Sequence, residues 1–295
     1  MAKPATRHYC EFLQVRFTKV IAFTQCLNIG NNNSAKFRRN IEKLKTQNTY
    51  TGEVKKGSKK RITKAVDLLL QLSPLTKVYN PITNKYQKFR LTFITLTIPL
   101  QSAKMDVNYL YKSSLKPFLR WISEVKKANT YVYKLEFQKN GSPHYHITTN
   151  KFIRYDELKS KWNLLLQAAG ILDEHKFKFG NYNPNSTDIH QVFALKNIEA
   201  YLCKYLSKND NLDGTYKGKI WGCSDNLKGQ KMYTTEINRF NNLIIRRATE
   251  DGLIEVFQGK NFAIFKPTND SILNLLDNTQ LTEYKQHLKQ LKNGA

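Results

Sequence analysis

Acidic residues, cysteines and long apolar segments are all scarce in this chain of 295 residues. It contains 23 Asp and Glu against 48 Lys and Arg, which leaves a formal net charge of +25. The four cysteines are too few and too scattered for a disulfide framework, so we expect a reducing compartment. No apolar run approaches the roughly 18–20 residues of a membrane-spanning helix. Residues 1–8 contain no hydrophobic segment of a secretory signal. We therefore expect a soluble protein without a signal peptide.

Apolar and aromatic residues are plentiful, at 40% and 12% of the sequence. Chains that stay disordered contain few aromatic residues, so this composition predicts a folded core. The length suffices for one large domain or two small ones. The excess of positive charge favours a polyanionic partner, of which nucleic acid is the commonest. A membrane surface is the alternative, but the sequence has no basic amphipathic stretch with a Trp/Leu face.

Hydrophobic periodicity predicts an α+β fold. It indicates helices at 61–72, 106–127, 155–168 and 195–208, and strands at 91–98, 131–138, 144–149 and 187–193. This order of elements predicts a central antiparallel sheet with helices packed on one side. We expect three regions: a basic, partly helical N-terminal extension (1–85), a central domain (86–234), and a C-terminal region (235–295). The last would hold a hairpin of 253–257 with 262–265 and a helix over 271–292, with no assigned role.

Basic residues are concentrated in the segment 34–64, which contains eleven Lys and Arg against two acidic residues. Its densest part is Lys55, Lys56, Lys59, Lys60 and Arg61. Such a run is either a solvated loop or a phosphate-binding clamp, and the sequence leaves both interpretations open.

Two histidines flank one residue in His144-Tyr145-His146. Residues two apart on a strand point to the same face, so both imidazoles project together. Two imidazoles suit a divalent metal when a third ligand is near, and Glu136 on the preceding strand is the candidate. The three share a face only if an odd number of residues connects the strands, and a loop centred on Gly141 would place Glu136 opposite His146. The alternative is that both histidines are ordinary sheet residues.

The helix predicted at 195–208 carries two tyrosines. Its narrow apolar stripe consists of Leu195, Ile198, Leu202 and Leu206. At about 100° per residue, Tyr201, Lys204, Tyr205 and Lys208 group on a flank away from that stripe. A phenol with a pKa of about 10 needs a cation or a metal to act as a nucleophile, and Lys204 is placed to supply a charge. The alternative is that both tyrosines simply pack against the core.

Three segments, 93–98, 136–146 and 201–208, carry a resemblance through their order in the chain. Together they resemble the three motifs of HUH rolling-circle replication initiators. The two tyrosines four residues apart around a lysine resemble the motif in initiators of small isometric single-stranded DNA phages. The wider pattern, including Trp221-Gly-Cys-Ser224, is similar to replication-associated proteins of microviruses and filamentous phages. The resemblance covers most of residues 55–230.

The resemblance implies an RRM-like HUH nickase domain over 86–234. Glu136, His144 and His146 would bind Mg²⁺ or Mn²⁺ against the scissile phosphate. Tyr201 or Tyr205 would attack single-stranded or melted origin DNA, leaving a 5′-phosphotyrosine and a 3′-hydroxyl primer, and the strand would later be rejoined. Lys204 would assist, and the expected nucleic-acid contacts are Lys208, Lys55, Lys56, Lys59, Lys60 and Arg61. A host helicase and polymerase would complete replication in the cytoplasm of a bacterial host.

Three other functions remain open from the sequence. A transposase or plasmid relaxase of the HUH type would use the same residues for the same chemistry. A non-catalytic nucleic-acid-binding protein would carry the motifs for packing alone. A metal hydrolase would use water as the nucleophile and form no covalent intermediate.

Overall fold

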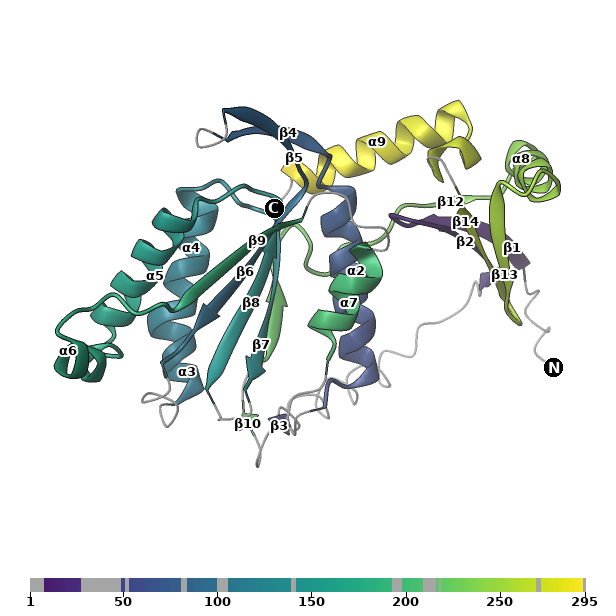
Figure 1. Ribbon diagram of the computed structural model, residues 1–295. Coiled ribbons are helices and arrows are strands. Elements are labelled where there is room, and N and C mark those ends of the chain that lie inside the picture. Colours follow the sequence, from purple (N-terminus) through teal and green to yellow (C-terminus); the bar gives the residue numbers. More distant parts are fainter. Residues whose placement is uncertain are drawn as a thin grey trace, which may run out of the picture. The chain divides into compact units, whose positions relative to one another are not determined.

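The computed structural model describes residues 8–27, 49–50, 53–80, 84–99, 106–138, 142–192, 198–208, 216–217, 219–268 and 272–293. The chain forms two compact units (Figure 1). The central unit comprises residues 48–228, and the terminal unit comprises residues 1–47 together with 229–295. Both combine helices with antiparallel sheets, so the predicted α+β class is confirmed. Among the described residues, no helix is both long enough and apolar enough to cross a membrane.

This division differs from the three regions expected from the sequence. The N-terminal strands pair with strands of the C-terminal region in one sheet, so neither end of the chain forms a region by itself. Residues 48–85, expected in the N-terminal extension, belong to the central unit. The difference arises because pairing between strands that are distant in the sequence leaves no local periodicity. The basic residues before position 49 lie outside the described residues.

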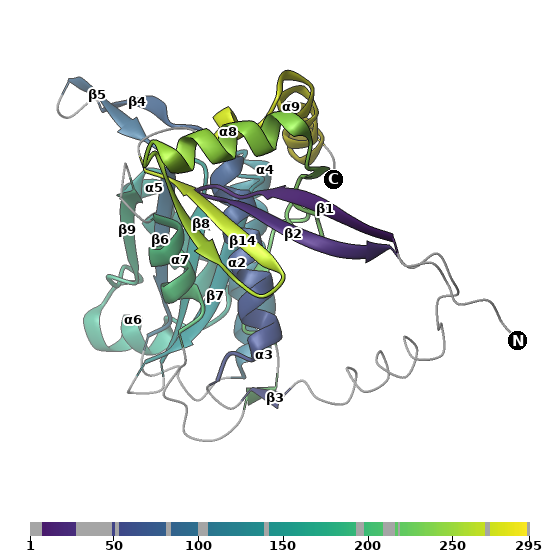
Figure 2. The same ribbon diagram turned by 90° about the vertical axis from the view of Figure 1, so that its right-hand side faces the viewer.

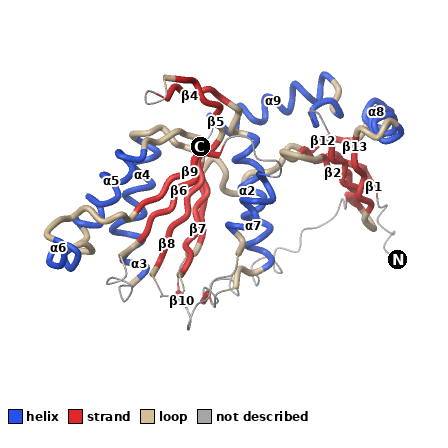
Figure 3. Tube along the Cα trace, in the orientation of Figure 1, coloured by secondary structure: helices blue, strands red, loops and turns tan. Residues whose placement is uncertain are grey.

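The sheet of the central unit has five strands in the order β11-β7-β8-β6-β9, and every neighbouring pair is antiparallel (Figure 3). The strands are β6 (Leu91–Thr97), β7 (Tyr131–Phe137), β8 (Pro143–Thr149), β9 (Thr187–Val192) and β11 (Trp221–Cys223). The middle strands β6 and β8 are almost wholly buried, in keeping with their β-branched and aromatic residues. The predicted strands at 91–98, 131–138, 144–149 and 187–193 are thus confirmed to within about a residue.

Helices cover both faces of this sheet, so the prediction of helices on one side is wrong (Figures 1 and 2). One face packs against α4 (Lys116–Glu124) and α5 (Tyr155–Ala168), where the buried Trp162 contacts Tyr145 and donates from its indole nitrogen to the Thr97 carbonyl at 3.1 Å. The other face carries α2 (Lys56–Gln71) and α7 (Ile198–Leu206). The error arose because α2 was assigned to the N-terminal extension and not to the sheet.

Smaller elements complete the central unit. The predicted helix at 106–127 is a succession of α3 (Val107–Leu110), a π-helical turn η2 (Tyr111–Leu115) and α4. The remaining elements are β3 (Thr49–Tyr50), β4 (Thr76–Asn80), β5 (Lys85–Phe89), α6 (Asp173–Phe179) and β10 (Tyr216–Lys217).

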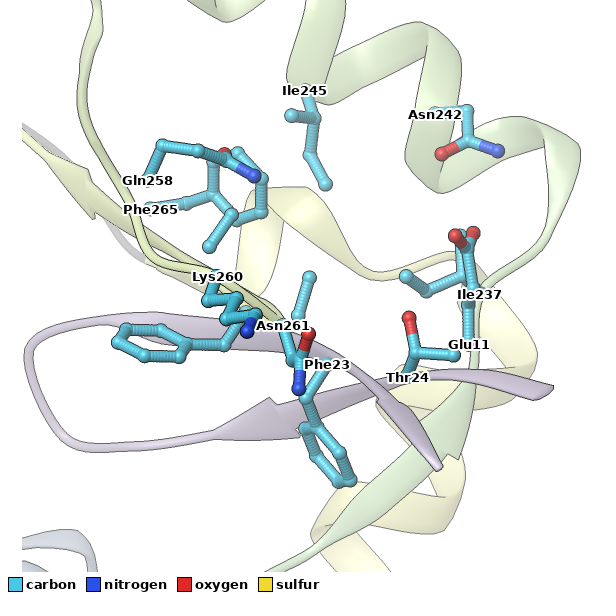
Figure 4. Close-up of a pocket in the computed structure, with 13 residues that line it drawn as sticks. Glu11, Phe23, Thr24, Ile237, Asn242, Ile245, Gln258, Lys260, Asn261 and Phe265 are labelled. Carbon is cyan, nitrogen blue, oxygen red and sulfur yellow. The ribbon is translucent and has the colours of Figure 1, made fainter. Parts of the chain in front are cut away.

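The terminal unit is a five-stranded antiparallel sheet in the order β12-β1-β2-β14-β13. Its elements are β1 (His8–Val15), β2 (Val20–Leu27), β12 (Thr234–Glu236), α8 (Arg239–Glu250), β13 (Ile254–Gln258), β14 (Phe262–Pro267), η3 (Ile272–Leu275) and α9 (Asn278–Asn293). The hairpin predicted at 253–257 and 262–265 is confirmed. Leu13, Val15 and Val20 form the core with residues of η3 and α9. Figure 4 shows a hollow of about 270 Å³ between α8 and this sheet, lined by residues such as Ile245 and Phe265.

Two glycines of the central unit provide a matched test of its packing. A Cβ on Gly222 of β11 would lie 2.6 Å from the ring of the buried Tyr133, whereas a Cβ on Gly57 of α2 would meet nothing within 4 Å. We expect Gly222→Ala to lower the free energy of unfolding by about 1–3 kcal/mol through overpacking. Gly57→Ala should raise it by about 0.5–1 kcal/mol, because alanine favours the helix. Denaturant unfolding of both variants measures this, and a Gly222→Ala protein as stable as Gly57→Ala would contradict the packing of β11.

Candidate active site

The β7–β8 hairpin brings Glu136, His144 and His146 to one face of the sheet. Phe137 pairs with Pro143, so residues 138–142 connect the strands and the loop is odd, as expected. The predicted register, however, is wrong by two residues, because Glu136 pairs with His144 and not with His146. The Gln138 amide donates to the Ser142 carbonyl at 3.0 Å, which centres the loop one residue earlier than expected. Asn140 and Gly141, expected to form the turn, lie outside the described residues.

Glu136 and His146 are joined by a direct hydrogen bond. The Nε2 atom of His146 lies 2.6 Å from Oε2 of Glu136, and its Nδ1 atom lies 3.2 Å from Oγ1 of Thr95 on β6. The ring of Phe93 stacks on the imidazole, with 5.8 Å between centroids and 18° between planes. Contacts at both nitrogens and on the ring therefore fix the orientation of His146.

The two remaining members of the cluster carry opposite charge preferences. Hydrogen bonding from His146, together with the nearby Lys208, lowers the pKa of the Glu136 carboxyl to about 2 despite its burial, so this group is ionised. Burial, and the charge of His146, lower the pKa of His144 to about 4, so this imidazole is neutral near pH 7. The Nε2 atom of His144 is buried and has no hydrogen-bond partner.

The α7 helix directs Tyr205 toward this cluster. Its hydroxyl lies 3.2 Å from both ring nitrogens of His146, and the two rings are nearly perpendicular, with 4.8 Å between centroids. Burial, then the charge of Glu136, raises the pKa of Tyr205, so its phenol is protonated in the free protein. Tyr201 stacks on Tyr205 with 6.3 Å between centroids but is 48% exposed. The predicted tyrosine pair therefore has one member at the cluster and one at the surface.

The lysines of α7 differ in their surroundings. Lys208, expected as a nucleic-acid contact, places its Nζ atom 3.3 Å from Oε1 of Glu136. Lys204 is exposed. Leu202 and Leu206, the described part of the predicted apolar stripe, are fully buried, which confirms the core face.

The basic residues Lys55, Lys56, Lys59, Lys60 and Arg61 stand at the beginning of α2, so the interpretation as a solvated loop is wrong. No acidic residue occurs in the first turn of this helix. The Arg61 guanidinium lies 5.9 Å from the ring centroid of Trp221 on β11, the strand beside β7. The start of α2 therefore adjoins the strand next to the one that carries Glu136.

Sequence reasoning missed two features of the site. Lys134 is buried on the same face as Glu136 and pairs with His146 across the strands. Asp188 and His190 form an exposed ion pair of 2.8 Å on β9, and the Asp188 charge contributes to the raised pKa of Tyr205. The alternation along each strand contained the signal for Lys134, which has the parity of Glu136.

The donor set fits a divalent cation. Among the described residues, no three His, Cys, Asp or Glu side chains already surround a common point, because Glu136 and His146 bind each other. An ionised carboxylate and two imidazoles, one of them neutral with an unpartnered buried nitrogen, are nevertheless suitable ligands for Mn²⁺ or Mg²⁺. Binding requires His146 to exchange its carboxylate partner for the ion.

Comparison with known proteins places this cluster in a recognised segment. Residues 91–210 match a family model of replication-associated proteins of the ORF2 type. The match includes β6, the β7–β8 hairpin and α7, and therefore all of Glu136, His144, His146, Tyr201 and Tyr205. No curated protein and no solved structure matches the chain.

The neutral state of His144 has a consequence for stability. Its pKa is about 4 in the folded protein against 6.5 in the unfolded chain, so folding favours the neutral form. The resulting stability is present above pH 6.5 and is lost as the pH falls toward 4. In metal-free buffer, the free energy of unfolding of the wild type, minus that of His144→Gln, should therefore decrease between these two pH values. A difference that does not change with pH would contradict the neutral, buried imidazole.

Proposed function

We propose that this protein nicks and rejoins single-stranded DNA through a covalent tyrosine intermediate and so initiates rolling-circle replication. The observation that carries the proposal is the Tyr205 hydroxyl, which faces His146 while His146 binds Glu136. This geometry lies within the segment that matches a family of replication-associated proteins. A transposase or relaxase would use the same chemistry, but the match to a replication family favours replication.

The reaction is a phosphoryl transfer that conserves the energy of the phosphodiester. The Tyr205 oxygen attacks phosphorus, the bond from phosphorus to the 3′ oxygen breaks, and the phenol proton leaves to solvent or a nearby base. The products are a 5′-phosphotyrosine and a 3′-oxygen, which takes up a proton and becomes a primer for a host polymerase. In the reverse reaction a 3′-hydroxyl attacks the phosphotyrosine and rejoins the strand without ATP.

Tyr205 needs activation, because burial and the negative charge of Glu136 both oppose its ionisation. Mn²⁺ or Mg²⁺ held by Glu136, His144 and His146 would act as a Lewis acid on the scissile phosphate. The His144 imidazole is already neutral and needs no deprotonation to serve as a ligand. Neutralising the Glu136 charge would also remove one of the causes of the raised pKa of Tyr205.

The two tyrosines are suited to successive transfers. Tyr205 is half-buried at the cluster and serves as the first nucleophile, whereas the exposed Tyr201 is one helical turn away and is free to attack in a later round. The exposed Lys204 lies between them in the sequence and contacts phosphate next to the scissile bond.

The start of α2 supplies the grip on the DNA backbone. Helix N-termini carry a partial positive charge, and acidic residues in the first turn stabilise it. In α2 that turn has none, and Lys55, Lys56, Lys59, Lys60 and Arg61 add five positive charges. Phosphate groups of single-stranded DNA neutralise such a cluster, while Trp221 beside Arg61 offers an aromatic ring for stacking.

Substitution of the tyrosines tests the covalent step. The protein is incubated with Mn²⁺ and a pool of labelled single-stranded oligonucleotides with a randomised central segment, and adducts that survive denaturation are quantified. Tyr205→Phe should slow adduct formation by about 100-fold, because Tyr201 must then reach the phosphate from a poorer position. Tyr201→Phe should leave the first attack nearly unchanged, and the double variant should form no adduct.

The other outcomes separate the alternatives. Cleavage without an adduct would support a metal hydrolase, and binding without cleavage would support a non-catalytic nucleic-acid-binding protein. Either result with the wild type contradicts the proposal. Both tyrosine variants should bind the oligonucleotides like the wild type, which shows that the loss lies in the chemistry.

The salt dependence of binding tests the role of α2. Each phosphate contact with single-stranded DNA contributes about 0.7 to the slope of log affinity against log salt, so replacing Lys59, Lys60 and Arg61 by Gln should reduce the slope by about 2. A control with the same charge change replaces Lys285, Lys289 and Lys292 of α9 by Gln, and should change the slope much less. An equal loss in both triple variants would show that net charge, and not α2, carries the binding.

A further inference from the structure

Lys134 is among the largest fully buried side chains of the described chain, at 1% exposure. The geometry points to this residue as the positioning residue that holds Tyr205 against His146, an inference that rests on the function proposed above. Lys134 does not contact the reacting groups of DNA in this account. It acts through the position of α7.

A single hydrogen bond ties the end of α7 to the sheet. The Nζ atom of Lys134 donates to the main-chain carbonyl of Lys208 at 2.7 Å. Lys208 follows the last residue of α7 closely, and its amide donates to the Tyr205 carbonyl at 3.4 Å. The tether therefore fixes the backbone of the same turn that carries Tyr205.

The tether belongs to a closed set of contacts around the site. Lys134 and Glu136 project from the same face of β7, and Lys134 pairs with His146 on β8. The side chain of Lys208 contacts Glu136 at 3.3 Å while its carbonyl accepts from Lys134. The chain at the end of α7 is thus attached to β7 at two points, close to the turn from which Tyr205 reaches His146.

A buried ammonium is an expensive way to fill space. Removing a charge from water costs several kcal/mol, and apolar residues of similar volume often make a protein equally or more stable. An apolar side chain at position 134, however, cannot bind a helix carbonyl. A cation at a helix C-terminus also interacts favourably with the exposed carbonyls there. These considerations assign Lys134 to the placement of α7 and not to the stability of the core.

The inference makes a distinction between the two tyrosines. Tyr205 precedes Lys208 by one turn, whereas Tyr201 lies a further turn from the tether and is stacked on Tyr205 at the surface. Loss of the tether should therefore misplace Tyr205 more than Tyr201. A merely structural lysine would affect both tyrosines equally.

Two substitutions test the tether. Lys134→Met removes both the charge and the donor, and Lys134→Gln removes the charge but keeps a donor. Single-turnover adduct formation is measured with Mn²⁺ and an oligonucleotide selected by the wild type, and the modified tyrosine is identified by peptide mass spectrometry. Lys134→Met should slow attack by Tyr205 by about 100-fold and raise the share of adduct on Tyr201. Lys134→Gln should fall between it and the wild type, and the exposed control Lys285→Met should match the wild type.

Hydrogen exchange provides a readout that does not depend on the proposed function. Amides of residues 205–208 should exchange faster in Lys134→Met, while those of α5 should be unchanged. Unchanged exchange together with an unchanged tyrosine distribution would overturn the inference even if the wild type forms adducts. A wild type that forms no adduct would overturn the proposed function, whereas faster exchange in the variant would still support the tether. If Lys134→Met does not fold, Lys134→Gln carries the same comparison.

Discussion

The odd loop between β7 and β8 is the constraint on which the candidate site depends. Because side chains alternate along a strand, a shift of one residue in this hairpin would turn Glu136 away from the histidines. The hydrogen bond from the Gln138 amide to the Ser142 carbonyl closes the loop in the register that keeps them together. The same alternation directs Tyr145 to the opposite face, where Trp162 anchors the apolar layer of α5. One register therefore specifies both the polar cluster and the core behind it.

The polar face is stabilised by contacts that suit chemistry. Glu136 is shared between His146 and Lys208, and the carbonyl of Lys208 in turn accepts from the buried Lys134. His144 remains without a partner for its buried Nε2 atom, which is a cost to stability that a metal ligand would explain. Tyr205 is held next to this cluster in a protonated state. The arrangement is consistent with a site that becomes active when a cation and DNA bind.

Much of this site was predictable from local patterns. The parity of Glu136, His144 and His146, the odd loop and the flank of α7 with its two tyrosines all follow from the periods of strands and helices. The register itself did not follow, since Pro143 and the short loop allowed more than one odd spacing. Neither the covering of a second sheet face by α2 nor the pairing of β1 and β2 with the C-terminal strands was visible, because contacts between distant segments leave no periodic signal. Lys134 was overlooked because a lysine on a strand is usually exposed.

The central claim is that Glu136, His144 and His146 together bind a divalent cation beside Tyr205. Electron paramagnetic resonance of Mn²⁺ added to the protein tests it directly, since pulsed experiments detect the nitrogen nuclei of coordinated imidazoles. The account predicts a bound ion coupled to two histidine nitrogens, with one coupling lost in His144→Gln and the other in His146→Gln. Mn²⁺ that shows no histidine coupling, or couplings that survive in both variants, would contradict the account.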